Sequence, residues 1–268
     1  MARESLPICE AMTLVRVILL FSLFTSNGAR ANDAGLQGEA GNLYESGLIA
    51  QNDLRTSEAL ELMLQVEKLA PKNPKVLQKI ARQYSDSTID AISEIEQRQL
   101  LDRALAYSQR ATDLQPNDPV NVLSLAITRG KIAQLGDNKA KVEAARIIKA
   151  DARRAIELDP NYAWAHHVLG RWHREVDELG TITRFFTKIL YGGLPEASIE
   201  AAVYHLEKAT ALDPESLSHF LELGFAYQAA GEIKKARNIF EQGLSMPNRE
   251  KHDETVKALA REALAQLG

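Results

Sequence analysis

Apolar positions recur along the chain at helical spacing, and the amphipathic runs that they form stop at similar short phrases. Each phrase places a proline where a helix has to end, because proline lacks the backbone N–H and clashes with the preceding turn. Successive phrases are 45, 44 and 54 residues apart, and each spacing is 34 residues plus an insertion. The phrases are Leu69-Ala70-Pro71, Leu114-Gln115-Pro116, Leu158-Asp159-Pro160 and Leu212-Asp213-Pro214.

The last unit, residues 217–249, shows the repeat most clearly. Its large residues fall at relative positions 4, 7, 11 and 24, where they fill the interface between two neighbouring helices. A glycine at position 8 lets those helices approach each other. The spacing resembles the tetratricopeptide repeat. The residues that carry it are Phe220, Leu223, Gly224, Tyr227, Ala236, Phe240 and Gly243, followed by Pro247.

The same register fits five units in order. It predicts an all-α, right-handed tetratricopeptide-like helical solenoid of about five helix pairs, in one domain over residues 32–268. The insertions fall between the two helices of a unit and extend those hairpins. After Pro247, Asp253 can N-cap a final helix over residues 252–267 that covers the end of the solenoid. The predicted units are residues 40–73, 74–118, 119–162, 163–216 and 217–249.

The first 31 residues have the layout of a signal peptide, with an apolar run at 14–24 before the small residue Ala31. This run contains an arginine and is shorter than the about 20 residues that span a bilayer. We predict cleavage after Ala31, with Met12 as an alternative start, and therefore export to the periplasm or secretion. The alternative is an anchor to an organelle, the mitochondrion or the endoplasmic reticulum.

Composition narrows the function only slightly. The chain has 268 residues with 32 Lys and Arg against 36 Asp and Glu, a net charge of −4, so no overall positive charge favours nucleic acid as a partner. The single cysteine, Cys9, excludes an intrachain disulfide. A content of 45% apolar and 25% charged residues is ordinary for a globular protein.

Several stretches resemble a particular family, the regulators of microtubule dynamics, over about residues 40–247. They are Leu43–Gly47, Lys79–Arg82, Ala144–Lys149 with Ala155–Pro160, and Leu169–Trp172 with the insertion that follows. The resemblance implies an all-α, tetratricopeptide-like fold without enzymatic activity. It also implies links to microtubules, mitochondria and the endoplasmic reticulum, and in one branch to lipid binding.

The first helix of each unit is expected to line a concave groove, with relative positions 2, 5, 9 and 12 facing it. Arginines there would pair with carboxylates of an extended protein or peptide ligand, and aromatic residues would anchor it. The alternative is that the arginines pair with Glu175, Asp177 or solvent. The candidate groove residues are Lys75, Gln78, Arg82, Trp164, His167, Arg171, Arg174, Phe225 and Gln228.

The insertion at residues 181–198 suggests a second hypothesis, lipid or membrane binding. An apolar stripe with Arg184 and Lys188 beside it is typical of a helix that lies on a membrane or covers a lipid pocket. The basic stretch 129–154 could meet anionic headgroups. The alternatives are that the insertion packs back onto the solenoid and that the basic stretch is a solvated helix face. The candidate membrane residues are Phe185, Phe186, Ile189 and Leu190, together with Ile182.

No pattern in the sequence predicts catalysis, a metal or a cofactor. His166 and His173 share a helix face, but they occupy positions 4 and 11, where the repeat buries large side chains. His167 lies in the groove set instead. The chain lacks the motifs HExxH and GxSxG, a P-loop and a dinucleotide fingerprint. We therefore expect a binding scaffold rather than an enzyme.

Overall fold

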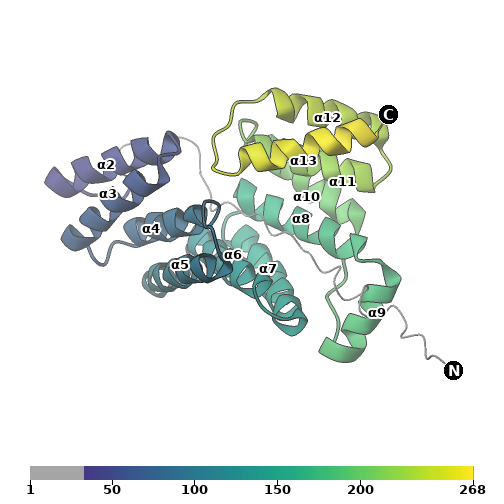
Figure 1. Ribbon diagram of the computed structural model, residues 1–268, viewed down its shortest axis with the longest axis horizontal. Helices are drawn as coiled ribbons and strands as arrows, with labels where there is room; N and C mark the ends of the chain where they lie inside the picture. Colours follow the sequence, from purple (N-terminus) through teal and green to yellow (C-terminus); the bar gives the residue numbers. More distant parts are fainter. Residues whose placement is uncertain (1–32, 268) are drawn as a thin grey trace.

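The computed structural model describes residues 33–267, except for the side chains of residues 181 and 182. This part of the chain contains twelve α-helices and no strand (Figure 1). The predicted signal peptide, residues 1–31, lies outside the described residues. The helices are α2 (Gly38–Asn52), α3 (Thr56–Leu69), α4 (Pro74–Ser87), α5 (Glu94–Leu114), α6 (Pro119–Gln134), α7 (Asn138–Leu158), α8 (Ala163–Glu178), α9 (Gly180–Tyr191), α10 (Ile199–Leu212), α11 (Leu217–Ala229), α12 (Ile233–Ser245) and α13 (Asp253–Gln266).

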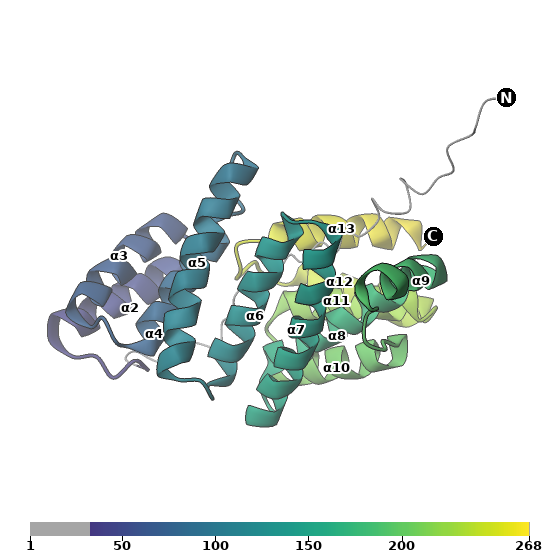
Figure 2. The same ribbon diagram turned by 90° about the horizontal axis from the view of Figure 1, so that it is seen from below.

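The helices pack in pairs that stack into a curved solenoid. The pairs are α2 with α3, α4 with α5, α6 with α7, α8 with α10, and α11 with α12. Each pair also contacts the next, and α13 covers α11 and α12 at the C-terminal end (Figures 1 and 2). The prediction of an all-α tetratricopeptide-like solenoid is confirmed.

Local sequence signals set the ends of the helices. The side chains of Asn73 and Asp118 each accept hydrogen bonds from the next backbone N–H groups and so cap α4 and α6. Pro74 and Pro119 follow at the first helical position, where a missing N–H costs nothing. The four repeated phrases end α3, α5, α7 and α10, whose last residues are Leu69, Leu114, Leu158 and Leu212.

The two helices of a pair come closest where the repeat has glycine at position 8. A Cβ atom on Gly224 would lie 2.5 Å from the ring of Phe240, and one on Gly170 would lie 2.6 Å from Leu206. Both distances are shorter than any normal carbon–carbon contact. Only a residue without a side chain therefore lets α11 approach α12, and α8 approach α10, this closely.

The insertions change the hairpins in two ways. Helices α5 and α7 are both 21 residues long, and the fourth pair gains the additional helix α9 between α8 and α10. Helix α9 ends at Gly192, which adopts a left-handed conformation with φ of 77°. Within residues 33–267, no helix has both the length and the apolar content that crossing a bilayer requires.

Candidate binding site on the concave face

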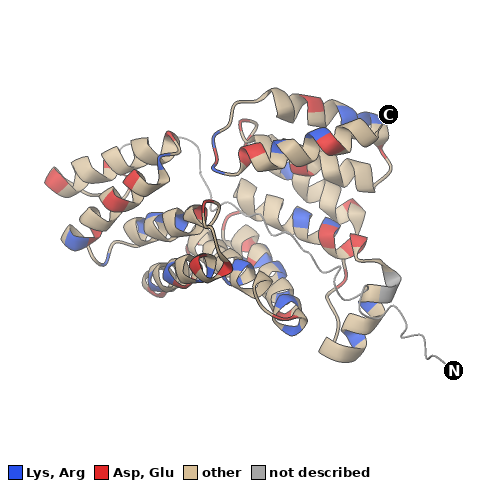
Figure 3. Cartoon of the chain, in the orientation of Figure 1, with Lys and Arg blue, Asp and Glu red and all other residues tan. Residues whose placement is uncertain are grey.

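The inner side of the solenoid is lined by polar and charged side chains. The first helices of neighbouring pairs contact each other there, α4 with α6 and α8 with α11. Helices α4 and α8 carry residues of both signs, whereas the charged residues of α6 are basic and the one of α11 is acidic (Figure 3). We call this side the concave face. Its buried polar residues include Arg82, Ser85 and Asp86 on α4, His167 and Arg171 on α8, and Ser218, His219 and Glu222 on α11.

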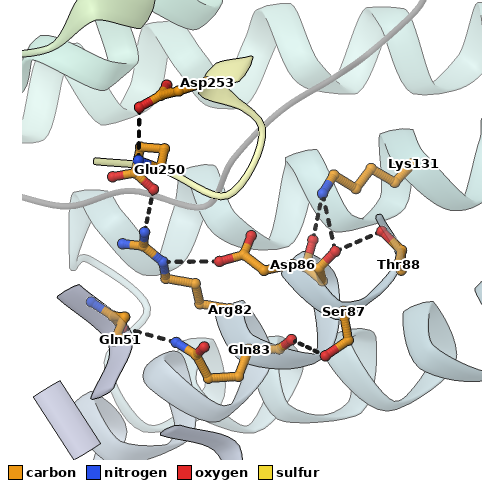
Figure 4. Close-up of polar contacts among 10 residues, drawn as sticks. Gln51, Arg82, Gln83, Asp86, Ser87, Thr88, Lys131, Glu250 and Asp253 are labelled. Atoms are coloured by element: carbon orange, nitrogen blue, oxygen red, sulfur yellow. Dashed lines mark hydrogen bonds and ion pairs between the residues drawn. The ribbon is translucent and has the colours of Figure 1, made fainter. Parts of the chain in front are cut away.

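Arg82 is the centre of a buried charge cluster on the concave face (Figure 4). Its Nε lies 3.3 Å from Oδ2 of Asp86, and its guanidinium also pairs with Glu250, which follows α12. All three side chains are about 5% exposed. A buried arginine that pairs with two carboxylates is held in one orientation, because moving away from either carboxylate would leave that buried charge without compensation.

Lys131 of α6 extends the same cluster. Its Nζ donates to Oγ of Ser85 at 2.6 Å, and burial lowers its pKa to about 8. Burial raises the pKa of Asp86, even though Arg82 and Lys131 favour the ionised carboxylate. Within the described part of the chain, Oδ1 of Asp86 accepts no hydrogen bond. The cluster therefore contains an acceptor that a ligand could use.

A second charge cluster holds the other two predicted groove arginines. Nε of Arg171 lies 2.7 Å from Oε1 of Glu175, and Nε of Arg174 donates to Oε1 of Glu222 at 2.7 Å. Arg174 also pairs with Glu178 at 2.7 Å. The alternative partner Glu175 is thus present, so a ligand carboxylate would have to compete with carboxylates of the chain itself. That these arginines bind a ligand stays a prediction.

The predicted anchor Trp164 lies among histidines instead of at the surface. It is 3% exposed, and its ring centroid lies 4.6 Å from that of His219 and 4.9 Å from that of His167. The two histidines meet through their Nδ1 atoms at 3.0 Å. Burial lowers the pKa of both well below the ordinary value, so both rings are neutral at pH 7. Trp164 therefore fixes the packing of α8 on α11.

A second histidine cluster lies between α8 and α10. The Nδ1 atoms of His166 and His205 are 3.0 Å apart, and the rings of His173 and His205 are stacked with centroids 6.1 Å apart. Burial lowers the pKa of His173 and of His205 to about 4. In the part of the chain that the structure describes, no group of three or more His, Cys, Asp and Glu side chains is placed to hold a metal ion.

The other predicted groove residues are more accessible. Nζ of Lys75 lies 3.7 Å from Asp118, and Nε2 of Gln78 donates to Oδ1 of Asn121 at 3.1 Å. Phe225 is half-buried and packs edge-on against Phe240, with Arg174 above its ring. Gln228 is half-buried one helical turn further along α11. Lys75, Gln78, Phe225 and Gln228 are therefore among the predicted residues that a partner could reach without unfolding the solenoid.

Glu250, Lys251 and His252 also belong to the concave face, and sequence reasoning missed them. They lie between the last repeat and α13, where no repeat position predicts a direction for a side chain. Nζ of Lys251 lies 2.9 Å from Oδ2 of Asp90 in the loop between α4 and α5. Only the curvature of the solenoid brings this segment near α4, so no local signal could have found it.

Helix α9 forms a separate surface with an outward apolar stripe. Exposed fractions are 58% for Phe185, 39% for Phe186, 62% for Ile189 and 54% for Leu190. Thr187, on the opposite side, is buried. Arg146 of α7 donates to backbone carbonyls at the C-terminal end of α9, so α7 fixes this end of the insertion. These four described side chains of the stripe point away from the solenoid, and the side chain of Ile182 lies outside the described residues.

A small apolar pocket lies beneath α9. It encloses about 490 Å³, counting the part that is open to solvent. Trp172 forms part of its wall and donates through Nε1 to the carbonyl of Ala145 at 2.7 Å. Lys141 and Glu175 are the charged residues of its lining. The wall also includes Val142, Ile148, Val176, Leu179, Thr187 and Leu194.

The fold and the polar concave face define a tetratricopeptide-like helical scaffold. A crystal structure of TTC0263, a thermophilic tetratricopeptide protein of Thermus thermophilus, is 17% identical and superposes with a TM-score of 0.60 over 84% of this chain and 99% of that chain. At this identity the likeness concerns the fold alone.

The family is shown by the sequence. The family described as regulator of microtubule dynamics protein 1-3 matches residues 39–268, so the chain belongs to this family. Regulator of microtubule dynamics protein 1 of Mus musculus is 26% identical over 85% of this chain and 73% of that protein. The protein of the same description from Bos taurus is 28% identical over 84% of this chain and 69% of that protein. The resemblance seen in the sequence is confirmed.

Proposed function

We propose that the chain is a non-enzymatic scaffold that binds an extended segment of a partner protein on its concave face. The observation that carries the proposal is the polar, charged lining of that face, which offers hydrogen-bond and ion-pair partners along several helix pairs. Extended peptides are recognised by such fixed polar groups together with a few aromatic anchors. Phe225 and Gln228 supply accessible positions beside the second charge cluster.

Site-specific photo-crosslinking tests this proposal. A photoreactive benzoylphenylalanine at position 228 of α11 is expected to form adducts with a partner in the native cell. The same group at Gln242, which is exposed on α12 of the same pair, serves as the matched control. Adducts from position 242 and none from position 228 would overturn the concave face as the binding surface.

The identity of the adduct decides how far the role of the relatives extends. Those relatives are named regulators of microtubule dynamics. An adduct with a tubulin-like protein would support the same role for this chain. An adduct with any other protein would identify a different partner for the scaffold. In either case Lys75→Glu is expected to weaken binding of the purified partner about tenfold. Lys68→Glu, at an exposed position on α3, is expected to leave binding unchanged.

As a second candidate we propose that α9 docks on an anionic membrane surface. The observation in its favour is the exposed stripe of Phe185, Phe186, Ile189 and Leu190, with the exposed Lys188 beside it. Apolar residues that enter the headgroup region and basic residues that meet anionic lipids contribute independently to such binding. The basic side chains of α7 next to α9 add to the same attraction.

Vesicle flotation tests the second candidate. The chain is expected to float with vesicles of phosphatidylcholine and phosphatidylglycerol, and to do so more weakly when phosphatidylglycerol is left out. Phe185→Asp with Phe186→Asp should abolish flotation. Ile92→Asp with Ile95→Asp is the control, because these residues are 95% and 73% exposed at another tip of the molecule. Equal flotation of all variants would contradict a role for α9.

A further inference from the structure

The connection between α12 and α13, residues 246–252, reaches across the inside of the solenoid to the second helix pair. Glu250 pairs with Arg82 of α4, although the two residues are 168 positions apart. Lys251 pairs with Asp90, just beyond the end of α4. Figure 4 shows the Glu250 carboxylate above the Arg82 guanidinium, with Asp86 on the other side. The connection thus occupies part of the concave face.

Polar contacts hold this connection in place. Pro247, Asn248 and Arg249 are exposed, and the side chains that it buries, Glu250 and His252, are both polar. Asp253 accepts hydrogen bonds from the backbone N–H groups of Arg249 and Glu250, both at 2.7 Å, which shapes the turn before α13. Met246, at the start of the connection, packs against the core beside α12, whereas residues 247–252 bury no large apolar side chain. These six residues can therefore leave their site without exposing hydrophobic surface to water.

The charges around Arg82 define what can take the place of Glu250. Lys79 and Lys131 lie in the same cluster, and burial lowers the pKa of each to about 8, so both are still protonated at pH 7. Without Glu250, three cations, Arg82, Lys79 and Lys131, would remain in the cluster against two carboxylates, Asp86 and the more distant Asp33, which acts on Lys79. An incoming carboxylate restores the balance, whereas an incoming cation would add to the repulsion.

The structure leaves hydrogen-bonding capacity unused at this place. In the described part of the chain, Oδ1 of Asp86 and Nε2 of His252 are buried and have no hydrogen-bond partner. Such groups cost free energy unless a partner arrives. The connection therefore satisfies the charge of Arg82 without satisfying all of the polar atoms beside it.

We infer that residues 246–252 occupy, within the chain itself, the binding site of an acidic peptide ligand. Glu250 takes the place of the carboxylate of that ligand. The inference rests on the proposed function. It adds the chemical class of the partner and a segment of the chain that regulates access to the site. A partner segment binds by presenting a carboxylate to Arg82 and a hydrogen-bond donor to Asp86, and it displaces the connection. Because the internal segment is tethered, it competes at a high effective concentration and keeps the site closed to weak ligands.

The test uses the segment as a separate molecule. The probe is a synthetic peptide with the sequence of residues 246–253, MPNREKHD, and a second peptide in which glutamine replaces its glutamate. Binding is measured by NMR titration of the wild-type chain and of Glu250→Ala. The matched control variant is Glu241→Ala, which removes an exposed carboxylate on α12.

We expect Glu250→Ala to bind the glutamate peptide at least about tenfold more tightly than the wild type and Glu241→Ala do. The glutamine peptide should lose that gain, because it brings no carboxylate to Arg82. Arg82→Gln in the Glu250→Ala background should lose it as well, with circular dichroism showing that the helices persist. Equal binding of the two peptides, or no binding to Glu250→Ala, overturns the inference.

The outcome can be separated from that of the proposed function. If position 228 forms adducts with a partner while Glu250→Ala binds neither peptide, the scaffold role stands and the inference about the connection fails. If Glu250→Ala binds the glutamate peptide while position 242 alone forms adducts, Arg82 accepts an acidic peptide in place of Glu250, but the proposed function fails because the native partner uses another surface.

Discussion

Replacing Glu222 by alanine is expected to lower the free energy of unfolding by about 3–5 kcal/mol. Glu222 is 4% exposed, accepts a hydrogen bond from Nε of Arg174 at 2.7 Å and lies 3.9 Å from Nε of Arg171. Without this carboxylate two arginines on the concave face lose much of their compensation while they remain buried. Urea unfolding followed by circular dichroism measures the loss.

Glu178→Ala is the matched control for this experiment. Glu178 also pairs with Arg174, at 2.7 Å, but its side chain is 47% exposed. Solvent screens this pair, so we expect its loss to cost about 1 kcal/mol or less. Equal costs for the two variants would show that burial does not set the strength of these ion pairs.

The folded chain is expected to lose stability steeply as the pH falls below about 6.5, the ordinary pKa of histidine. All six histidines have pKa values lowered by burial, to about 4 for His173 and His205 and to about 3 for His252. The unfolded chain binds protons in this range and the folded chain does not, so acid favours unfolding. Each histidine that stays neutral in the fold costs about 2 kcal/mol at pH 5.

The geometry of the histidine pairs gives the reason. His167 and His219 face each other through Nδ1 atoms 3.0 Å apart, and His166 and His205 do the same. One nitrogen of each pair has to be an acceptor, which a doubly protonated pair cannot provide. The buried carboxylates Asp86 and Glu175 have raised pKa values in the folded chain. At lower pH they bind protons more tightly in the folded chain than in the unfolded chain, which offsets part of the loss of stability.

Urea midpoints measured between pH 7.5 and 3.5 check this prediction. His205→Gln should make the dependence on pH shallower by about 1.4 kcal/mol per pH unit, because one proton fewer distinguishes the two states. Below pH 4 the dependence should weaken, since His173 and His205 then bind protons in the folded chain too. A midpoint that stays constant from pH 7 to pH 5 would contradict the assignment of neutral buried histidines.

The repeated phrases and the glycines at position 8 made the helix pairs predictable, because both act locally. A proline two residues after Leu158 ends α7 whatever lies around it, and Gly224 is the residue that α11 needs where Phe240 packs against it. The family could be recognised for the same reason, since its stretches are contiguous in sequence. The signal peptide and the export of the protein remain predictions.

The sequence by itself therefore determined the helix pairs and their order, because these follow from spacing within a single unit. Only the tertiary structure decided what the inward charges meet. Arg82 and Arg174 have carboxylate partners on other elements, at Glu250 and Glu222, and no local pattern encodes a distance of 168 residues. The curvature of the whole solenoid, summed over all of its pair contacts, brings Glu250 to Arg82.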